Sequence, residues 1–471
     1  MSSYKTTAGI EIHCELKTKA KIFSPAPNSY TTLANSNINE IDFAYPGVLP
    51  TINEEAVRLA LRAAILLNCK INKVMYFDRK NYFYPDLPKG YQITQARTPI
   101  GVDGYVEIET ENGTKKIGIH DIHIEEDTAK SIHHNNKTLL DFNRCGLPLI
   151  EIVSDPDINT KEEAIKYVQK LKELFFYANI SDCKIEEGSM RCDVNVSVSK
   201  TEELGTRTET KNVGSISSVG EVIEKESLRQ IEVIESGEKI YEETRRYDED
   251  KKTTILMRRK ETGNDYRYFP DGDFPPLVLT DEFIETTKKE IPLMPDEIRK
   301  ILKQNELNEA NIEKIIANKK VCDYLLTLEN TNLRLASNLL LSDIASYLNK
   351  TNKNLEETHL TKKRFEKLVK KLENKEIDNK MIKDALIDLM EKEIEIDELF
   401  KNASSNMIDE KTLKDLIKKV VDENPESITD FKEGRDRAVK FLMGQIMKQT
   451  KGCAPASLAN ELLKEELTSR N

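Results

Sequence analysis

Four segments of the chain alternate between apolar and polar residues, and their polar positions carry charged groups. They are residues 9–18, 117–127, 190–199 and 207–212. A period of two predicts β-strands, because successive side chains of a strand point to opposite faces of a sheet. In the first segment Ile10 and Ile12 share one face, while Glu11 and His13 share the other. These strands therefore present rows of charged or metal-binding groups where solvated strands usually carry Thr or Ser.

The pattern of the chain changes near Pro292, which divides it into regions. Before Pro292, short strand-like segments are interrupted by helical periodicity at about 54–67, after Thr160, and at about 219–236. Strands and helices without strict βαβ alternation predict an α+β fold, with a mixed and largely antiparallel sheet. After Pro292 the periodicity is helical almost throughout, with a polar linker at 401–410. We therefore predict three domains: a sheet domain at 1–292, a helical domain at 293–400 and a small helical tail at 401–471.

Length and charge limit the class of protein. At 471 residues the chain is too long for a single core. The formal net charge of −11 means that any contact with RNA has to be a local patch. We expect no membrane span, because no long uncharged apolar run is present. The first residues, MSSYKTTAG, lack the pattern of a secretory or transit peptide. Seven cysteines without CxxC spacing favour reduced thiols, so we expect a cytoplasmic protein.

The polar strand faces predict a site for a divalent cation. Glu11 and His13 on one strand could combine with acidic residues of the other three, which are Glu125, Glu126, Asp193 and Glu209. Oxygen ligands with at most one imidazole suit Mg²⁺ or Mn²⁺ better than Zn²⁺. The alternative is a set of solvated strand faces whose exposed ion pairs add little stability.

The segment FDRKNYFYPDLPKGYQITQ, residues 77–95, combines cations with aromatic rings. Its cations are Arg79, Lys80 and Lys89, and its rings include Tyr82, Phe83, Tyr84 and Tyr91. Such a segment could stack an adenine or a terminal RNA base and neutralise phosphates. The alternative is a buried aromatic turn packed against the sheet, and both interpretations can hold on opposite sides of the loop.

A second rigid, proline-rich segment, residues 257–277, places Arg267 between two tyrosines. Such an Arg could clamp a phosphoryl group in a transition state. The alternative, an Arg that holds its own loop by pairing with carboxylates, is at least as compatible with the composition. The chain has no GxxxxGK[ST] loop, so ATP is not expected to bind in the P-loop manner.

Several motifs, in this order, resemble one family. They are GIEIHCELKTKAKIF, FDRKNYFYPDLPKGYQIT, HIEEDTAK, FNRCGLPLIEIVSDPD, EEGSMRCDVNVS, TETKN and DYRYFPD. Together they closely resemble the B subunits of the glutamyl/aspartyl-tRNA amidotransferases, the GatB family. The tail FLMGQIMKQTKGCAPASLANELLKEEL resembles the C-terminal tRNA-binding module of that family.

The resemblance implies a fold, a reaction and partners. The fold would be a cradle-shaped sheet domain related to glutamine synthetase, followed by the helical domain and the tail. With ATP and Mg²⁺ (or Mn²⁺), the chain would phosphorylate the side-chain carboxylate of misacylated Glu-tRNA(Gln) or Asp-tRNA(Asn). Ammonia released from glutamine by a partner amidase (A-type) subunit would then attack the acyl phosphate. A small C-type subunit would complete a heterotrimer.

The resemblance also assigns roles to residues. Glu11, His13, Glu126, Asp193 and Glu209 would hold the metal, with Glu125 beside them as a catalytic group. Lys80, Lys211 and Arg267 would act on the phosphates, and Arg79, Tyr82 and Lys89 would bind the nucleotide. Some relatives bind a structural zinc through Cys pairs after the ELKT motif. The corresponding stretch here has no cysteine, so we expect no zinc.

Two alternatives to the transamidation subunit stay open. One is a free-standing ligase that amidates a small carboxylic acid with ATP and ammonia. The other is a non-catalytic adaptor that docks the acceptor end of tRNA. A basic helical tail would not be needed by the first, and the second would consume no ATP.

Overall fold

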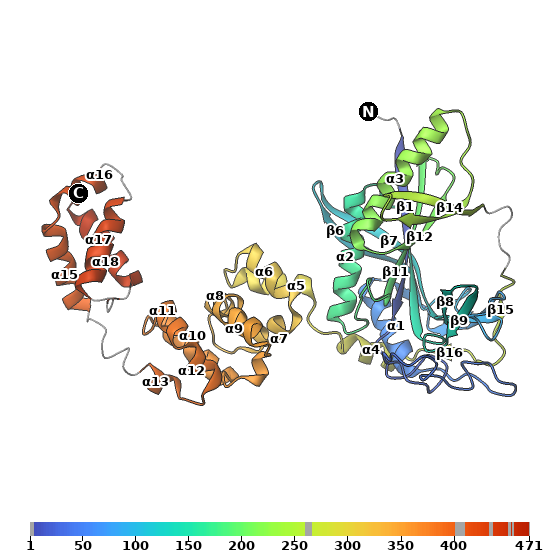
Figure 1. The fold of residues 1–471 in the computed structure, drawn as a ribbon, viewed down its shortest axis with the longest axis horizontal. Helices are drawn as coiled ribbons and strands as arrows, with labels where there is room; N and C mark the ends of the chain where they lie inside the picture. Colours follow the sequence, from blue (N-terminus) through green and yellow to red (C-terminus); the bar gives the residue numbers. More distant parts are fainter. Residues whose placement is uncertain are drawn as a thin grey trace. The chain divides into compact units, whose positions relative to one another are not determined.

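The computed structural model describes residues 4–259, 266–400, 410–432, 437–450, 454 and 456–470. The chain divides into two compact units, Met1–Pro295 and Asp296–Asn471. In their described parts, the first unit contains the strands and four helices, and the second is helical (Figure 1). This mixture confirms the predicted α+β class. The predicted linker at 401–410 lies, apart from Glu410, outside the described residues.

A nine-stranded sheet, among the described residues, is the centre of the first unit. Its order is β14-β13-β12-β11-β1-β10-β7-β6-β2. The neighbours pair antiparallel except β12 and β13, which are parallel. The bounds are β1 Lys5–Glu15, β2 Lys70–Ile71, β6 Gly101–Thr110, β7 Gly113–Glu126, β10 Pro148–Ser154, β11 Met190–Ser199, β12 Thr208–Val213, β13 Glu243–Asp248 and β14 Thr253–Arg259.

Three helices cover one face of this sheet: α1 (Glu54–Leu66), α2 (Lys161–Tyr177) and α3 (Ile216–Glu235) (Figure 1). Each begins where a side-chain oxygen accepts a hydrogen bond from a backbone N–H of the first turn. The capping residues are Asn53, Thr160 and Ser215. Apolar strand residues such as Ile12, Ile124 and Val194 are fully buried in one core with these helices. The charged side chains of the same strands therefore lie on the opposite face.

Short strands border the large sheet. A three-stranded sheet has the order β15-β4-β5, and two pairs are β16-β3 and β8-β9. Their bounds are β3 Val74–Met75, β4 Asp78–Asn81, β5 Tyr91–Thr94, β8 Lys130–His134, β9 Lys137–Asp141, β15 Phe269–Pro270 and β16 Leu277–Val278. The strand β5 meets the end of β7, since Gln92 donates hydrogen bonds to the side chain of Glu125 and the carbonyl of Glu126. Helix α4 (Asp281–Lys289) ends the unit.

The second unit is built from short helices. They are α5 Pro295–Gln304, α6 Glu309–Ala317, α7 Lys319–Thr327, α8 Leu333–Leu339, a π-helical turn Leu340–Ile344, α9 Ala345–Thr351, a 3₁₀ turn Leu355–Glu357, α10 Lys362–Glu373, α11 Asn379–Asp384, α12 Leu386–Glu391, α13 Ile396–Leu399, α15 Glu410–Asp422, α16 Pro425–Lys432, α17 Arg437–Gln449 and α18 Ala456–Ser469. Helices α15, α17 and α18 bury a common cluster that includes Leu413, Leu442 and Leu463. Within the described ranges, no helix has both the length and the apolar character to cross a membrane.

Candidate metal centre and nucleotide site

The strand registers bring the predicted charged rows together on the face that the helices leave uncovered. His13 of β1 lies opposite Glu151 of β10, and Glu11 lies opposite Asp193 of β11. Asn195 of β11 is in turn paired with Glu209 of β12. Since neighbouring strands are only about 5 Å apart, a row of carboxylates across four strands becomes one dense acidic surface.

His13, Glu125 and Glu151 form the first candidate metal site, which we call the carboxylate–imidazole cluster. One ligand atom of each residue lies within 4.8 Å of those of the other two. His13 Nδ1 is 3.1 Å from Glu125 Oε1 and 3.8 Å from Glu151 Oε2. The three residues come from β1, β7 and β10, so the central strands of the sheet fix their positions.

The acidic groups of this cluster act strongly on the imidazole. Burial alone would lower the pKa of His13, but the hydrogen bond with Glu125 and the charge of Glu151 raise it to about 9. Glu151 has a lowered pKa, because His123, His13 and Lys80 outweigh the effect of burial. A protonated His13 therefore balances the carboxylates in the metal-free protein, and binding of a cation there requires its neutral form.

Glu11, Asp193 and Glu209 form a second group, the three-carboxylate cluster, whose oxygens also lie within 4.8 Å of one another. A cation from the protein already pairs with it: Lys211 Nζ is 2.6 Å from Asp193 and 2.9 Å from Glu209. Burial alone would lower the pKa of Lys211, and the two carboxylates raise it. Four of the five residues predicted as metal ligands are thus distributed over two neighbouring groups.

Glu126, which was predicted as a metal ligand, belongs to neither cluster. Because side chains alternate along β7, Glu125 and Glu126 leave the strand on opposite sides. The carboxylate of Glu126 instead pairs with Lys89 and accepts a hydrogen bond of 3.0 Å from the backbone N–H of Ile93. Glu125, predicted as a catalytic neighbour, takes the place beside His13.

A polar cavity of about 310 Å³ lies next to the carboxylate–imidazole cluster. Its walls include Lys80, Asp121, His123, Glu151 and Tyr268. Burial alone would lower the pKa of Lys80, whereas Glu125, Tyr268 and Glu151 raise it, so the amine stays charged. The Lys80 Nζ also lies 5.2 Å from the ring centre of Tyr266. The cavity thus combines a cation, carboxylates and aromatic rings, which are the groups that a nucleotide phosphate and base require.

Two further predicted residues, Arg79 and Tyr82, lie within or directly after β4 and contact other residues. Arg79 is bound to Asp271 and Asp273, each at 3.0 Å, and stacks on Tyr91 at 4.3 Å, so it ties β4 to the loop that follows β15. The ring of Tyr82 packs edge-on against Tyr84 and Tyr266. Tyr82 thus belongs to the group of aromatic rings next to Lys80.

Arg267 is exposed and has a positive φ of 46°. Its loop joins β4 directly beside Lys80, because the side chain of Asn81 donates a 2.8 Å hydrogen bond to the Arg267 carbonyl. The loop therefore stands next to the cavity residue Lys80.

Glu151 was missed by the sequence analysis, as were the cavity residues His123 and Asp121. His123 Nδ1 is 2.7 Å from Asp121, and its Nε2 is 3.3 Å from Glu151. The signal was present in the alternation of LPLIEIVS, where Glu151 stands between the buried Ile150 and Ile152. A short, mostly apolar run fits either a buried strand or part of a buried helix, so the pattern alone did not identify this strand.

The donor set of the carboxylate–imidazole cluster fits Mg²⁺ or Mn²⁺. It offers two carboxylates and one imidazole nitrogen, which such a cation accepts as ligands, and its Glu151 also lines the polar cavity. The three-carboxylate cluster offers more charge, but Lys211 already neutralises part of it. The first cluster is the stronger candidate because its Glu151 also lines the polar cavity that contains Lys80.

Comparison with known proteins places the chain in a family. A family model described as the GatB/GatE catalytic domain matches residues 6–285, and one described as the GatB domain matches residues 323–467. The chain belongs to the GatB family. It is 46% identical over 475 residues to the B subunit of the aspartyl/glutamyl-tRNA(Asn/Gln) amidotransferase of Bacillus licheniformis, with 99% of this chain and 100% of the relative covered. The same protein of Lysinibacillus sphaericus is 44% identical over 474 residues, with the same coverage.

Membership in the GatB family confirms the resemblance seen in the motifs. As a GatB-family protein, the chain is a subunit of a tRNA-dependent amidotransferase, an enzyme of the ligase type that serves translation. The catalytic-domain match covers both carboxylate clusters and the cavity.

Proposed function

We propose that this GatB-family protein uses ATP to activate the side-chain carboxylate of Glu or Asp carried by tRNA, and then amidates it. The substrates would be misacylated Glu-tRNA(Gln), Asp-tRNA(Asn) or both, in keeping with the names of the relatives. The observation that carries the proposal is the carboxylate–imidazole cluster beside a lysine-lined cavity. A site of this kind suits a nucleotide and a divalent cation.

A carboxylate resists attack by ammonia because its oxygen leaves poorly, whereas phosphate leaves well. Transfer of the γ-phosphoryl group to the carboxylate therefore has to come before amidation. His13, Glu125 and Glu151 would hold the cation, which neutralises charge on the transferring phosphoryl group when bound. Lys80 is kept protonated by its acidic neighbours and can donate to a phosphoryl oxygen. Lys211 lies on the same face, where its amine now pairs with Asp193. It could donate to a phosphate oxygen in place of that carboxylate.

We assign the ammonia supply and part of the RNA contact to other components. A partner amidase (A-type) subunit would release ammonia from glutamine, and a small C-type subunit would complete a heterotrimer. The helices from α15 onward would form a tail that contacts tRNA. The role in translation favours the cytoplasm as the place of action.

The direct test is to purify the chain with its bound partners and assay each misacylated tRNA. We expect amide formation that depends on glutamine, ATP and Mg²⁺, with release of ADP and phosphate. Amide formation without ATP, or ATP-dependent amidation of free glutamate but not of the tRNA ester, would contradict the proposal. Removal of residues 401–471 should abolish amidation of tRNA, whereas unchanged turnover would favour a free-standing ligase.

A further inference from the structure

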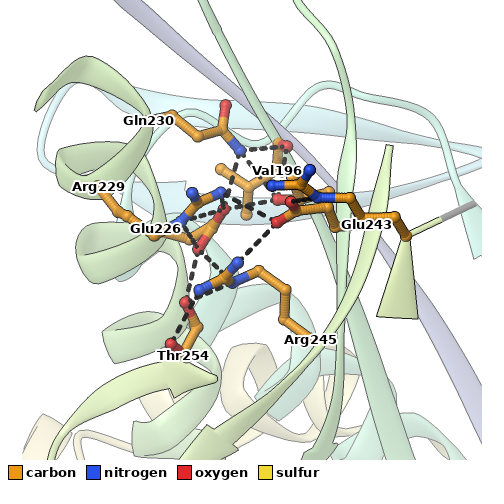
Figure 2. Close-up of polar contacts among 9 residues, drawn as sticks. Val196, Glu226, Arg229, Gln230, Glu243, Arg245 and Thr254 are labelled. Atoms are coloured by element: carbon orange, nitrogen blue, oxygen red, sulfur yellow. Dashed lines mark hydrogen bonds and ion pairs between the residues drawn. The ribbon is translucent and has the colours of Figure 1, made fainter. Parts of the chain in front are cut away.

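A network of buried charges lies beneath the edge of the large sheet, on the side opposite the two clusters. We call it the Glu226 network. Figure 2 shows Glu226 and Arg229 of α3 directed toward Glu243, Arg245 and Thr254 of β13 and β14, and the amide of Gln230 directed toward Val196 of β11. Its members are Thr208, Glu226, Arg229, Gln230, Glu243, Arg245 and Thr254. The proposed reaction uses none of them directly.

The carboxylate of Glu226 connects three successive strands. It accepts a hydrogen bond of 2.7 Å from the hydroxyl of Thr208 on β12 and another of 2.7 Å from that of Thr254 on β14. The guanidinium of Arg245 on β13 lies 3.5 Å away. Glu226 has no exposed side chain, and its pKa is lowered by Arg229 and the two hydroxyls although burial alone would raise it.

Two more residues extend the connections. The amide of Gln230 donates to the carbonyl of Val196 on β11 at 3.0 Å and to the hydroxyl of Thr208 at 2.9 Å. Arg245 donates to Glu243 at 2.7 Å and to the carbonyl of Thr254 at 3.0 Å. One helix is thereby hydrogen-bonded or ion-paired to four neighbouring strands, β11 to β14.

The residues that alternate with this network form one side of the candidate site. Thr208 and Thr210 point into the buried side, so Glu209 and Lys211 point to the charged face. Glu209 accepts a 3.1 Å hydrogen bond from the hydroxyl of Thr244, which stands between Glu243 and Arg245 in the sequence. Any shift of the network along β12 or β13 is therefore transmitted to Glu209 and Lys211.

Besides its backbone pairing, the strand pair that carries these residues is linked by the Thr244–Glu209 hydrogen bond, and the network adds contacts from the buried side. Among the pairs of the large sheet that the structure describes, β12 and β13 form the parallel one, and helix α3 is part of their connection. A parallel pair lacks the tight turn that fixes a hairpin. A slip of one residue would turn Glu209 and Lys211 to the opposite face.

Buried charges of this kind are weak evidence of a purely stabilising role. Apolar residues of similar volume often replace a buried ionic group without loss of stability, whereas the best-attested use of such a group is to fix a register. The contacts of Glu226 with β12 and β14 are suited to that use.

We propose that Glu226 is a positioning residue: its buried carboxylate holds β12, β13 and β14 in register so that Glu209 and Lys211 keep their places at the reaction site. The inference rests on the proposed function. It assigns to the helix-covered side of the sheet a role in the phosphate chemistry of the other side.

Two variants and two matched controls test this role in the intact complex. Glu226→Gln removes the charge, and Thr208→Val removes only the hydroxyl that links β12 to the carboxylate. The control for the first is Ile223→Ala, a buried apolar residue of the same helix. The control for the second is Thr287→Val, since Thr287 is also fully buried and its hydroxyl donates to the carbonyl of Phe283 within α4. Melting temperature, Mn²⁺ affinity and amidation kinetics are measured for all four.

We expect Glu226→Gln and Thr208→Val to lower kcat for amidation by about 10- to 100-fold. This is the usual range when a residue that orients the functional groups of a site is replaced. The KM for the misacylated tRNA and the Mn²⁺ affinity should stay within about twofold, because the carboxylate–imidazole cluster lies on other strands. The inference alone is overturned if the wild type is active and each variant loses no more activity than its control. A wild-type complex without ATP-dependent amidation would overturn the proposed function, and this inference with it.

Discussion

Replacement of Glu151 by Gln lowers ATP-dependent amidation by at least about 100-fold while the partner continues to hydrolyse glutamine. Glu151 is the residue that both histidines of the site contact, His13 at 3.8 Å and His123 at 3.3 Å. The neutral amide would remove one of the carboxylates that bind the cation and would lose the ion pairs with these imidazoles. Loss of a supporting residue around a metal costs about 10- to 100-fold, and loss of a ligand costs at least as much. The measurement is the rate of amide formation on misacylated tRNA beside the rate of glutamine hydrolysis.

A matched control for Glu151→Gln is Glu107→Gln. Glu107 also lies on a strand of the large sheet, but its side chain is half exposed and pairs with Lys116 at 3.7 Å. This variant should amidate at nearly the wild-type rate. If Glu151→Gln and Glu107→Gln both lowered the rate of amide formation only slightly and to the same extent, the assignment of Glu151 to the site would be contradicted.

Replacement of Asp42 by Ala destabilises the sheet domain by about 3–5 kcal/mol, the usual cost of breaking a buried ion pair. Lys21 is fully buried, and its amine pairs with Asp42 at 3.0 Å and donates to the carbonyl of Phe142 at 3.2 Å. Asp42 also accepts hydrogen bonds from Ser24 and from the backbone of Asn39. Without Asp42 the ammonium would remain buried with no opposite charge. Denaturant titration followed by circular dichroism measures the change in the free energy of unfolding.

The double variant Lys21→Met, Asp42→Leu separates the charge from the packing. If the cost comes from an uncompensated ammonium, the double variant should recover most of the stability that Asp42→Ala loses. A double variant as unstable as the single one would show instead that the shape of the loop at Asp42 matters more than its charge. The exposed pair of Lys5 and Glu202 is the surface control, and its removal should change stability little.

The sequence predicted the charged face well because a strand has a simple period. Glu11, His13, Asp193 and Glu209 lie on one face of adjacent strands, as their alternation with buried residues required. The same rule places Glu125 and Glu126 on opposite sides of β7. Because residues 125–127 are all acidic, the sequence did not show which of them points toward His13. Glu151 was missed for a different reason. It is the single acidic residue in a short apolar run, and such a run is typical of a strand buried on both faces.

The pairing of charges could not be predicted, since it depends on contacts between distant segments. Arg79 was expected to bind the nucleotide, yet Asp271 and Asp273 approach it from a loop that lies 192 to 194 residues later in the chain. Glu243 and Arg245 belong to a stretch rich in both acids and bases, and their contacts with each other and with Glu226 of helix α3 form a buried network. Local patterns define the face of an element, whereas the partners of each charge follow from the fold.

The most direct test of the metal assignment is an anomalous difference map of crystals grown with Mn²⁺ and a non-hydrolysable ATP analogue. The account predicts a peak coordinated by His13, Glu125 and Glu151, with a phosphate oxygen of the analogue on its open side next to Lys80. A peak bound by Glu126, or by the three-carboxylate cluster in place of Lys211 with His13 uncoordinated, would contradict it.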